Sequence, residues 1–344
     1  MVSRLGDLAL AIGAQLSGDP DIRISGVGTL RNAKQGEVSF LSNPQYRRHL
    51  AETHASAVIL APDDASHCPV AALISENPYL AYARAATHLF PPPGIEPGCH
   101  PSAIVAESAS LDTSAWVGAS VVIGERTRIE AGAFVGPGSV IGDDCFIGMD
   151  TRLVARVTLC QGTRIGQRGL IHPGAVLGAD GFGLANDDGR WEKVPQLGNV
   201  VVGDDVEIGA NTTIDRGALE DTVLEDGVKL DNQIQIGHNV HVGAHTAMAA
   251  ACAIAGSTKI GRHCTVGGVT AMAGHLTIGD NVHFSGATQV TRSFPDAGYY
   301  SGNLPAMANN EWRKAVARIR HLDEMAKRLK ILEKRVDSIK DGRK

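Results

Sequence analysis

Aliphatic side chains recur at every sixth position along most of this chain. The first run begins at Val105 and a second begins at Val202. After Ile214 the second run shifts by four extra residues, and it then keeps its period to Val290. A period this short is typical of a parallel β-helix, in which each hexad forms one flat face and three hexads close one coil. Residues 18 apart are therefore expected to stack at the ~4.8 Å spacing of neighbouring strands.

The first part of the chain lacks the hexad and mixes helical and strand patterns. Ala57–Leu60 and Val70–Ile74 are short apolar runs typical of buried strands, and Asn77–Pro78 opens a helical stretch that reaches Leu89. Apolar residues at helical spacing also occur near the start, at Leu5, Leu8, Ala9, Ile12 and Leu16. These patterns predict an α/β domain over residues 1–97, with Pro91–Gly94 as a stiff linker. The β-helix is expected over residues 98–304.

The last part of the chain, residues 305–344, is predicted to be helical from Asn309 onward. Its apolar positions alternate in steps of three and four and would form one stripe along the helix, in which Glu333 occupies the remaining position. These apolar positions are Ala315, Ile319, Leu322, Ala326, Leu329 and Val336. Lys and Arg outnumber Asp and Glu in this stretch. A solvated helical face is the default interpretation of such charges, and a docking surface for an acidic partner is the alternative.

A segment of 21 residues, 179–199, interrupts the hexads between the two runs. Long loops inside a compact repeat are more often functional than accidental. Phe182 and Trp191 lie within it, and large aromatic residues are poor choices for a free loop. We therefore favour a functional segment over a tolerated insertion.

Composition narrows the class of protein further. The 344 residues carry a formal net charge of -5 and include 40 glycines, with 4% aromatic residues. The negative charge, and the absence of a basic stripe interleaved with aromatic residues, argue against nucleic acid as a partner. The start of the chain lacks the pattern of a signal peptide, and no apolar stretch reaches the length of a membrane helix. A cytoplasmic protein with no transmembrane segment is expected.

Six cysteines are scattered along the chain without a CxxC pair. Cys145, Cys252 and Cys264 each occupy the fifth position of a hexad, where a small inward-facing residue fits. We interpret them as small core residues rather than as metal ligands or disulfide partners.

The hexad register brings three candidate catalytic residues to one corner. His238 and Gly256 are third residues of hexads one coil apart, and His275 is a fourth residue one coil further on. The two histidines are thus expected ~10 Å apart, with the glycine between them. Histidine is the usual general base, and Asp231 in the same coil could orient the ring. The N–H of Gly256 is a candidate oxyanion donor.

A metal site is the alternative use of this histidine-rich stretch. His238, His241 and His245 cluster in sequence, but they occupy the third, sixth and fourth positions of two successive hexads. Side chains at these positions point in different directions and do not suit one tetrahedral ion within a chain. Neither a metal nor another cofactor is therefore expected, although zinc shared between subunits stays open.

The whole chain resembles the UDP-3-O-acylglucosamine N-acyltransferases of lipid A biosynthesis. The resemblance rests on the hexads with their flanking domains and on four segments, Phe40–Tyr46, Gly178–Gly183, Thr213–Ala218 and Asp231–Val240. It implies a mainly β chain with a left-handed β-helix, an exception to the usual handedness of parallel crossovers. It further implies a homotrimer with active sites between subunits. The implied reaction moves a 3-hydroxyacyl chain from acyl carrier protein to the 2-amino group of UDP-3-O-acyl-glucosamine.

The resemblance also implies roles for individual residues. His238 matches the general base, Asp231 its acidic partner, His275 a second active-site histidine and Gly256 the oxyanion donor. Phe40 and Tyr46 match an aromatic pair that sandwiches uracil, and Asn43 matches the residue that reads the edge of the base; the physics of stacking and amide pairing is compatible with both roles. The basic C-terminal helix and Arg292 are expected to dock the acidic donor protein.

Three other classes of protein are built from the same repeat and are alternatives. The O-acyltransferase one stage earlier in the pathway is also a hexapeptide trimer, but the α/β domain with its aromatic pair argues against it. A γ-type carbonic anhydrase would use zinc between subunits. A non-catalytic solenoid would tolerate the loss of His238.

Overall fold

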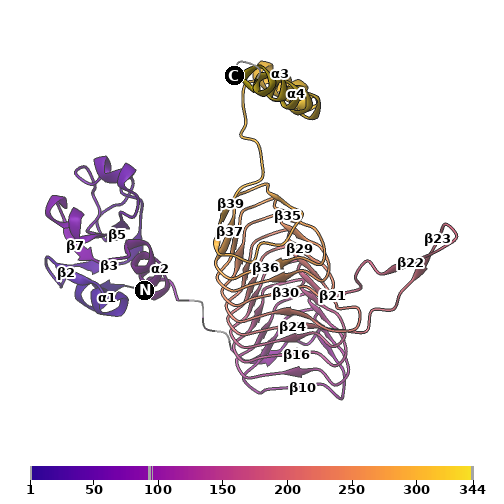
Figure 1. Cartoon of the computed structure of the whole chain (residues 1–344). Helices are drawn as coiled ribbons and strands as arrows, with labels where there is room; N and C mark the ends of the chain where they lie inside the picture. Colours follow the sequence, from indigo (N-terminus) through magenta and orange to yellow (C-terminus); the bar gives the residue numbers. More distant parts are fainter. Residues whose placement is uncertain (1, 92–93, 95, 342–344) are drawn as a thin grey trace. The chain divides into compact units, whose positions relative to one another are not determined.

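The computed structural model describes residues 2–91, 94 and 96–341, and the chain divides into two compact units, Met1–Ile95 and Glu96–Lys344 (Figure 1). Of the predicted linker, Pro92 and Pro93 lie outside the described residues. None of the described helices is long and apolar enough to cross a membrane.

The first unit is a five-stranded sheet with two helices packed on one of its faces. A small antiparallel pair, β1 (Ser3–Arg4) and β3 (Arg23–Ile24), and two 3-10 helices, η1 (Pro44–His49) and η2 (Pro62–His67), complete it. The strands of the sheet, in spatial order, are β2 (Gln15–Ser17), β7 (Ala71–Ile74), β6 (Ala57–Leu60), β5 (Glu37–Phe40) and β4 (Gly26–Val27). The helices are α1 (Leu5–Ile12) and α2 (Pro78–Leu89).

The helices and buried strands predicted for this unit are confirmed, with one correction. The four residues from Leu5 to Ile12 that were expected to be helical face the core, and Asn77 caps α2 by accepting a hydrogen bond from the N–H of Leu80 at 3.1 Å. Leu16, predicted to continue the first helix, lies instead in β2. Gly13 ends that helix in a left-handed conformation with φ 69°, which glycine adopts at little cost.

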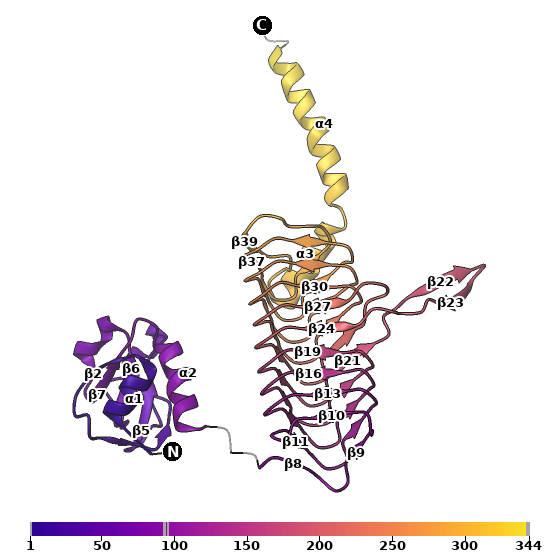
Figure 2. The ribbon, with the colours of Figure 1, turned by 90° about the horizontal axis from the view of Figure 1, so that it is seen from below.

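The second unit is a parallel β-helix with three flat faces of nine, ten and eleven strands (Figure 2). The nine-stranded face contains β10 (Ser110–Leu111), β13 (Arg128–Ile129), β16 (Phe146–Ile147), β19 (Arg164–Ile165), β24 (Val200–Val202), β27 (Thr222–Leu224), β30 (His241–Val242), β33 (Lys259–Ile260) and β36 (Thr277–Ile278). The ten-stranded face contains β9 (Ile104–Val105), β12 (Val122–Ile123), β15 (Val140–Ile141), β18 (Thr158–Leu159), β21 (Val176–Ala179), β26 (Thr213–Asp215), β29 (Gln235–Ile236), β32 (Ala253–Ile254), β35 (Ala271–Met272) and β38 (Gln289–Val290). The eleven-stranded face contains β8 (Gly98–Cys99), β11 (Trp116–Val117), β14 (Phe134–Val135), β17 (Arg152–Leu153), β20 (Leu170–Ile171), β25 (Glu207–Ile208), β28 (Lys229–Leu230), β31 (Ala247–Met248), β34 (Thr265–Val266), β37 (Val282–Phe284) and β39 (Gly298–Tyr300).

The strand pairing confirms the 18-residue spacing predicted from the hexads. Ile236 pairs with Ile254, and Ile254 pairs with Met272. Ile214 pairs with Ile236 instead, 22 residues further on, which accounts for the four-residue shift. The first residues of the hexads fill the interior, so one continuous apolar core extends along the axis of the coil.

The fifth positions of the hexads complete this interior. Cys145, Cys252 and Cys264 are buried, as predicted for small core residues. Burial raises the pKa of the Cys145 thiol to about 11, so this side chain is a neutral core group at physiological pH. Thr127, also at a fifth position, donates from Oγ1 to the carbonyl of Gly142 at 2.7 Å and thereby satisfies its buried hydroxyl.

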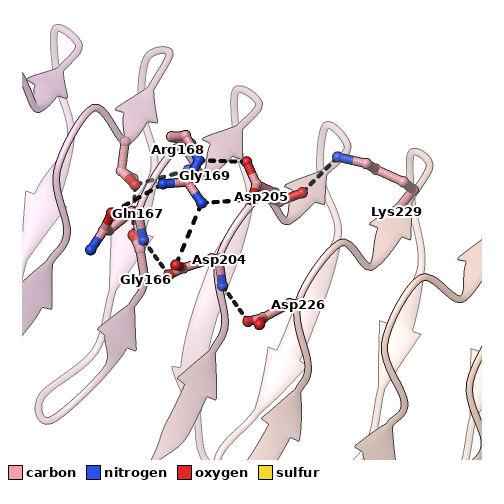
Figure 3. A network of polar contacts seen from close by, with 9 residues as sticks. Gly166, Gln167, Arg168, Gly169, Asp204, Asp205, Asp226 and Lys229 are labelled. Carbon is pink, nitrogen blue, oxygen red and sulfur yellow. Dashed lines mark hydrogen bonds and ion pairs between the residues drawn. The ribbon is translucent and has the colours of Figure 1, made fainter.

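Segment 179–199 leaves the coil as a projecting antiparallel hairpin of β22 (Leu184–Asp187) and β23 (Arg190–Lys193) (Figure 2). Phe182 and Trp191 are exposed here. The coils on either side of the insertion are joined by a polar network, in which Arg168 forms a two-pronged ion pair with Asp205 at 2.7 Å for both contacts (Figure 3). Lys229 of the following coil donates to the carbonyl of Asp205 at 2.6 Å. Stacking of the coils therefore continues across the interruption.

The chain ends in two helices, α3 (Asn309–Ile319) and α4 (Leu322–Asp341). The prediction of a helical segment from Asn309 is confirmed, although the helix is interrupted at Arg320 and His321. The apolar positions Ile319, Leu322, Leu329 and Val336 are exposed in the single chain.

Candidate active site

His238 lies at the corner that follows β29, where the ten-stranded face ends. Its carbonyl accepts a hydrogen bond from the N–H of Ser257 in the next coil at 2.8 Å, which fixes the backbone of the corner. The half-buried imidazole lies against the bare Cα of Gly256: a Cβ on that glycine would stand 2.6 Å from Nε2. A non-bonded carbon and nitrogen do not approach this closely, so the ring occupies space that only glycine leaves open.

Gly256 also presents an unused backbone donor at this corner. Its carbonyl accepts a hydrogen bond from the N–H of His275 at 3.0 Å, and this bond ties Gly256 to the next coil. Its own N–H has no acceptor among the described residues. An unpaired N–H beside an imidazole nitrogen is the arrangement that stabilises a developing oxyanion next to a general base. His238, Gly256 and His275 thus follow one corner, as the register predicts.

Asp231 lies at a different corner. It follows β28 of the eleven-stranded face, and its carboxylate accepts hydrogen bonds from the N–H groups of Asn232 at 2.8 Å and Ala250 at 3.0 Å. No hydrogen bond joins it to His238 within the described residues. The two side chains are therefore separated by one face of the coil within a single chain.

A second carboxylate, Asp215, lies nearer to the histidine, and the sequence did not single it out. Burial raises the pKa of Asp215, whereas a hydrogen bond from Gln235 and the charge of His238 lower it. Nε2 of Gln235 donates to Asp215 Oδ2 at 3.0 Å. This half-buried acid on the ten-stranded face contributes negative potential at the histidine corner.

The histidines that could have formed a metal site have other partners. Nε2 of His241 lies 2.9 Å from Glu225 Oε1, while the His245 ring stacks on His263 with 5.2 Å between the ring centroids. Among the residues that the structure describes, no three His, Cys, Asp or Glu side chains are grouped so as to hold a metal ion. His238 therefore does not share a site with the other two histidines in this chain.

A cavity of about 650 Å³ in the first unit is lined by the three residues predicted to bind a base. Phe40 ends β5, and its ring stacks on Tyr82 of α2 with centroids 4.0 Å apart, which holds the ring in place. Asn43 caps η1 by accepting from the N–H of Gln45 at 3.0 Å, so its NH2 group stays available for the edge of a base. Tyr46 lies one turn along η1 and is 53% exposed.

The same cavity is bordered by two arginines that sequence reasoning missed. Arg31 and Arg48 each donate from Nε to Nε2 of His49, at 2.9 and 3.1 Å. Because that nitrogen accepts, His49 is neutral with its proton on Nδ1; desolvation of the ring and then the charges of Arg31 and Arg48 lower its pKa. Neither arginine forms an ion pair with a carboxylate of the described residues. Two cations thus stand beside an aromatic pocket, which suits a ligand with a flat base and an anionic group.

Comparison with known proteins gives matches in both units. The family model for UDP-3-O-(3-hydroxymyristoyl) glucosamine N-acyltransferase, LpxD, matches residues 21–88, and the model for the bacterial transferase hexapeptide (six repeats) matches residues 120–155. The chain is 51% identical over 340 residues to the UDP-3-O-acylglucosamine N-acyltransferase of Pseudomonas fluorescens (strain SBW25), covering 98% of this chain and 97% of the relative. The enzyme of the same name from strain Pf0-1 is 53% identical over 333 residues, covering 96% and 95%.

Among solved structures, the UDP-N-acetylglucosamine acyltransferase of Francisella novicida is 22% identical, with a TM-score of 0.48, over 63% of this chain and 73% of that chain. The fold class expected from the sequence is confirmed: a mainly β chain with a left-handed parallel β-helix, an N-terminal α/β unit and a C-terminal helical extension.

Proposed function

The chain belongs to the UDP-3-O-acylglucosamine N-acyltransferase family of lipid A biosynthesis, and we propose that it transfers a 3-hydroxyacyl chain from acyl carrier protein to the 2-amino group of UDP-3-O-acyl-glucosamine, with His238 as general base. One observation carries the catalytic part of the proposal. The imidazole of His238 rests on Gly256, whose N–H is unpaired among the described residues. Base and oxyanion donor are therefore adjacent before any substrate arrives.

The chemistry follows from this arrangement. The sugar amine attacks the thioester carbonyl, a C–N bond forms, and the carbonyl oxygen takes up negative charge beside the N–H of Gly256. Nε2 of His238 takes the proton that the amine must lose. Collapse of the intermediate breaks the C–S bond and releases a thiolate, which recovers the proton from the imidazolium. A thiol has a pKa of about 8.5, so this leaving group needs little help from an acid. His275, whose N–H binds the carbonyl of Gly256, keeps the oxyanion donor in position.

The cavity of the first unit is the proposed uridine site. Phe40 and Tyr46 supply the aromatic faces, the NH2 group of Asn43 meets the edge of uracil, and Arg31 and Arg48 meet the diphosphate. These groups match the chemistry of a UDP-sugar, because an aromatic ring can stack on the base and a guanidinium group can donate to the diphosphate.

Removal of one aromatic face of this cavity is expected to weaken the use of the UDP-sugar selectively. Stacking of a base on an aromatic ring contributes about 1–3 kcal/mol, so Tyr46→Ala and Phe40→Ala should raise KM for UDP-3-O-acyl-glucosamine by about 5- to 150-fold. KM for the acyl donor should not change. Steady-state kinetics with each substrate varied in turn measures both. Tyr79→Ala is the matched control. Tyr79 is 63% exposed, and its ring centroid lies 6.0 Å from that of Phe40, but it does not line the cavity. Equal effects on both substrates would refute the uridine site.

The ten-stranded face of the β-helix supports a homotrimer. Ile104, Val122 and Val140 stack outward along it and are 67%, 38% and 46% exposed in the single chain. A row of exposed aliphatic side chains along one face is expected to be covered by another copy. Asp231 is then proposed to act on His238 across such an interface, because the two lie at different corners of one chain.

Mixed trimers test this arrangement. Chains that carry His238→Ala and chains that carry Asp231→Ala should each be nearly inactive alone. When co-expressed and purified as mixed trimers, they should regain part of the wild-type activity, because some interfaces combine an intact His238 with an intact Asp231. Trimers that mix His238→Ala chains with His275→Ala chains are the control. Because both histidines of a site lie on the same corner of one chain, no site in these trimers is intact, and they should regain no activity. Failure of the first mixture to recover activity would place Asp231 outside the site of a neighbouring copy.

The C-terminal helices and Arg292 are the proposed docking surface for the acidic carrier protein. Arg313, Lys314, Arg318 and Arg320 lie on or directly after the exposed α3. A purified chain should acylate UDP-3-O-acyl-glucosamine with 3-hydroxyacyl chains on acyl carrier protein, and a panel of chain lengths identifies the preferred donor. No transfer from any 3-hydroxyacyl carrier protein, or transfer to UDP-N-acetylglucosamine instead, would overturn the proposed function.

A further inference from the structure

The two interruptions of the hexad, segment 179–199 and the four-residue shift after Ile214, meet beside His238. The N–H of Leu197 donates to the carbonyl of Ala218 at 2.8 Å, and the N–H of Gly198 donates to the carbonyl of Gly217 at 2.9 Å. Nε of Arg216 donates to the carbonyl of Gly198 at 2.7 Å. The base of the hairpin and the shifted segment therefore form one irregular structure that is bound to the regular coil.

Asn239, which follows the proposed base, is the residue that this irregular structure holds. Its N–H donates to Oγ1 of Thr222 at 2.8 Å, and its Nδ2 donates to the carbonyl of Glu220 at 2.7 Å. Its Oδ1 accepts from the N–H of Ala218 at 3.0 Å. All three partners belong to residues 218–222, which lie in this place only because the register shifts by four residues.

These contacts determine which way the amide of Asn239 faces. A backbone N–H can only donate and a backbone carbonyl can only accept, so the atom beside Ala218 is oxygen and the atom beside Glu220 is nitrogen. Nδ1 of His238 lies 3.0 Å from that same Oδ1. Since the amide oxygen only accepts, the hydrogen bond requires a proton on Nδ1 of His238. The remaining nitrogen, Nε2, is then unprotonated in the neutral ring and faces Gly256.

We propose that Asn239, held by residues 218–222, is a positioning residue that keeps the proton of neutral His238 on Nδ1 and so leaves Nε2 as the basic nitrogen beside Gly256. The inference rests on the proposed role of His238 as general base. Asp215 accepts a hydrogen bond from Gln235 and forms none with His238 in the described part of the chain. Because Nδ1 already faces Asn239 and Nε2 faces Gly256, Asp231 of a neighbouring copy would act through its charge on the protonated ring and not on the tautomer. The tautomer is therefore assigned to Asn239.

Two readouts test the proposal. Asn239→Ala should lower kcat by about 10- to 100-fold, the range typical of losing a group that orients an imidazole, with KM for either substrate nearly unchanged. Asn239→Asp retains an oxygen acceptor for His238 and Ala218 and should recover part of the lost kcat. Asn281→Ala is the matched control. Asn281 also occupies the fourth position of a hexad, with φ 56° against 58° for Asn239. Alanine in this left-handed conformation should therefore destabilise the fold by the same amount at both positions.

The second readout is the ¹⁵N resonance of the His238 ring in histidine-labelled protein, assigned by its loss in His238→Ala. The wild type should show a protonated Nδ1 and an unprotonated Nε2 in the neutral ring, and Asn239→Ala should show a mixture of tautomers. An unchanged tautomer in Asn239→Ala, or a kcat equal to that of the Asn281→Ala control, would overturn the proposal. If His238→Ala retained full activity, the general base would be wrong, whereas the resonances would still report whether Asn239 sets the tautomer.

Discussion

Replacement of His238 by alanine is expected to lower kcat for acyl transfer by about 10²- to 10⁴-fold, the usual contribution of a positioned general base. The amine of the sugar would then have to lose its proton to water. KM for the UDP-sugar should change little, because the proposed uridine site lies in the other unit of the chain. Steady-state kinetics measures the loss, and thermal unfolding checks the fold.

His263→Ala is the control for this experiment. His263 is also a corner residue of the β-helix, but its ring stacks on His245 at a different corner. Its loss should leave kcat within a factor of about two, as expected for an exposed side chain without a role in the reaction. Comparable activity of the His238 and His263 variants would contradict the assignment of the base.

Gly256→Ala is expected to reduce kcat by at least about 10²-fold, the size of effect found when an oxyanion donor or its neighbour is misplaced. The added methyl would stand 2.6 Å from Nε2 and 2.7 Å from Cε1 of His238, so the ring must leave its position. The backbone of Gly256 is not in the left-handed region, so alanine brings no strain of its own. The unfolding temperature should change little.

Gly268→Ala is the matched control, since Gly268 is also a third residue of a hexad and its new methyl would meet nothing closer than 3.2 Å. A double variant sharpens the test. In a chain that already carries His238→Ala, the further change Gly256→Ala should cost much less than it does alone, because the two residues act as one unit. Fully additive losses would show that the glycine acts independently of the imidazole.

The β-helix could be predicted from the sequence because its period converts position along the chain into position in space. The pairing of Ile236 with Ile254 and Met272 follows directly from that period. The first unit has no repeat, so its elements had to be predicted one at a time. Leu16 was misplaced there because helical spacing alone does not reveal where Gly13 ends the helix.

The same reasoning explains which parts of the site were predictable. His238, Gly256 and His275 obey the register, and the sequence brought them to one corner. Asn239 was missed because its partners lie in residues 218–222, where the register shifts and the period no longer locates atoms. Arg31 and Arg48 were missed because their meeting at His49 depends on the tertiary fold of the first unit. The signal for Asn239 was the shift itself, since a break in a regular repeat needs a cause.

The coils before the hairpin contain none of the proposed catalytic residues, yet they determine where the first unit is attached. Each coil adds one strand to every face, so chain length there is converted into height in steps of ~4.8 Å. Gain or loss of 18 residues would raise or lower the attachment point while keeping it on the same side of the prism. Gain or loss of six would turn it by a third of a revolution. Insertion or deletion of whole hexads can therefore change the height and the side at which the β-helix begins, without altering the corner of the proposed active site.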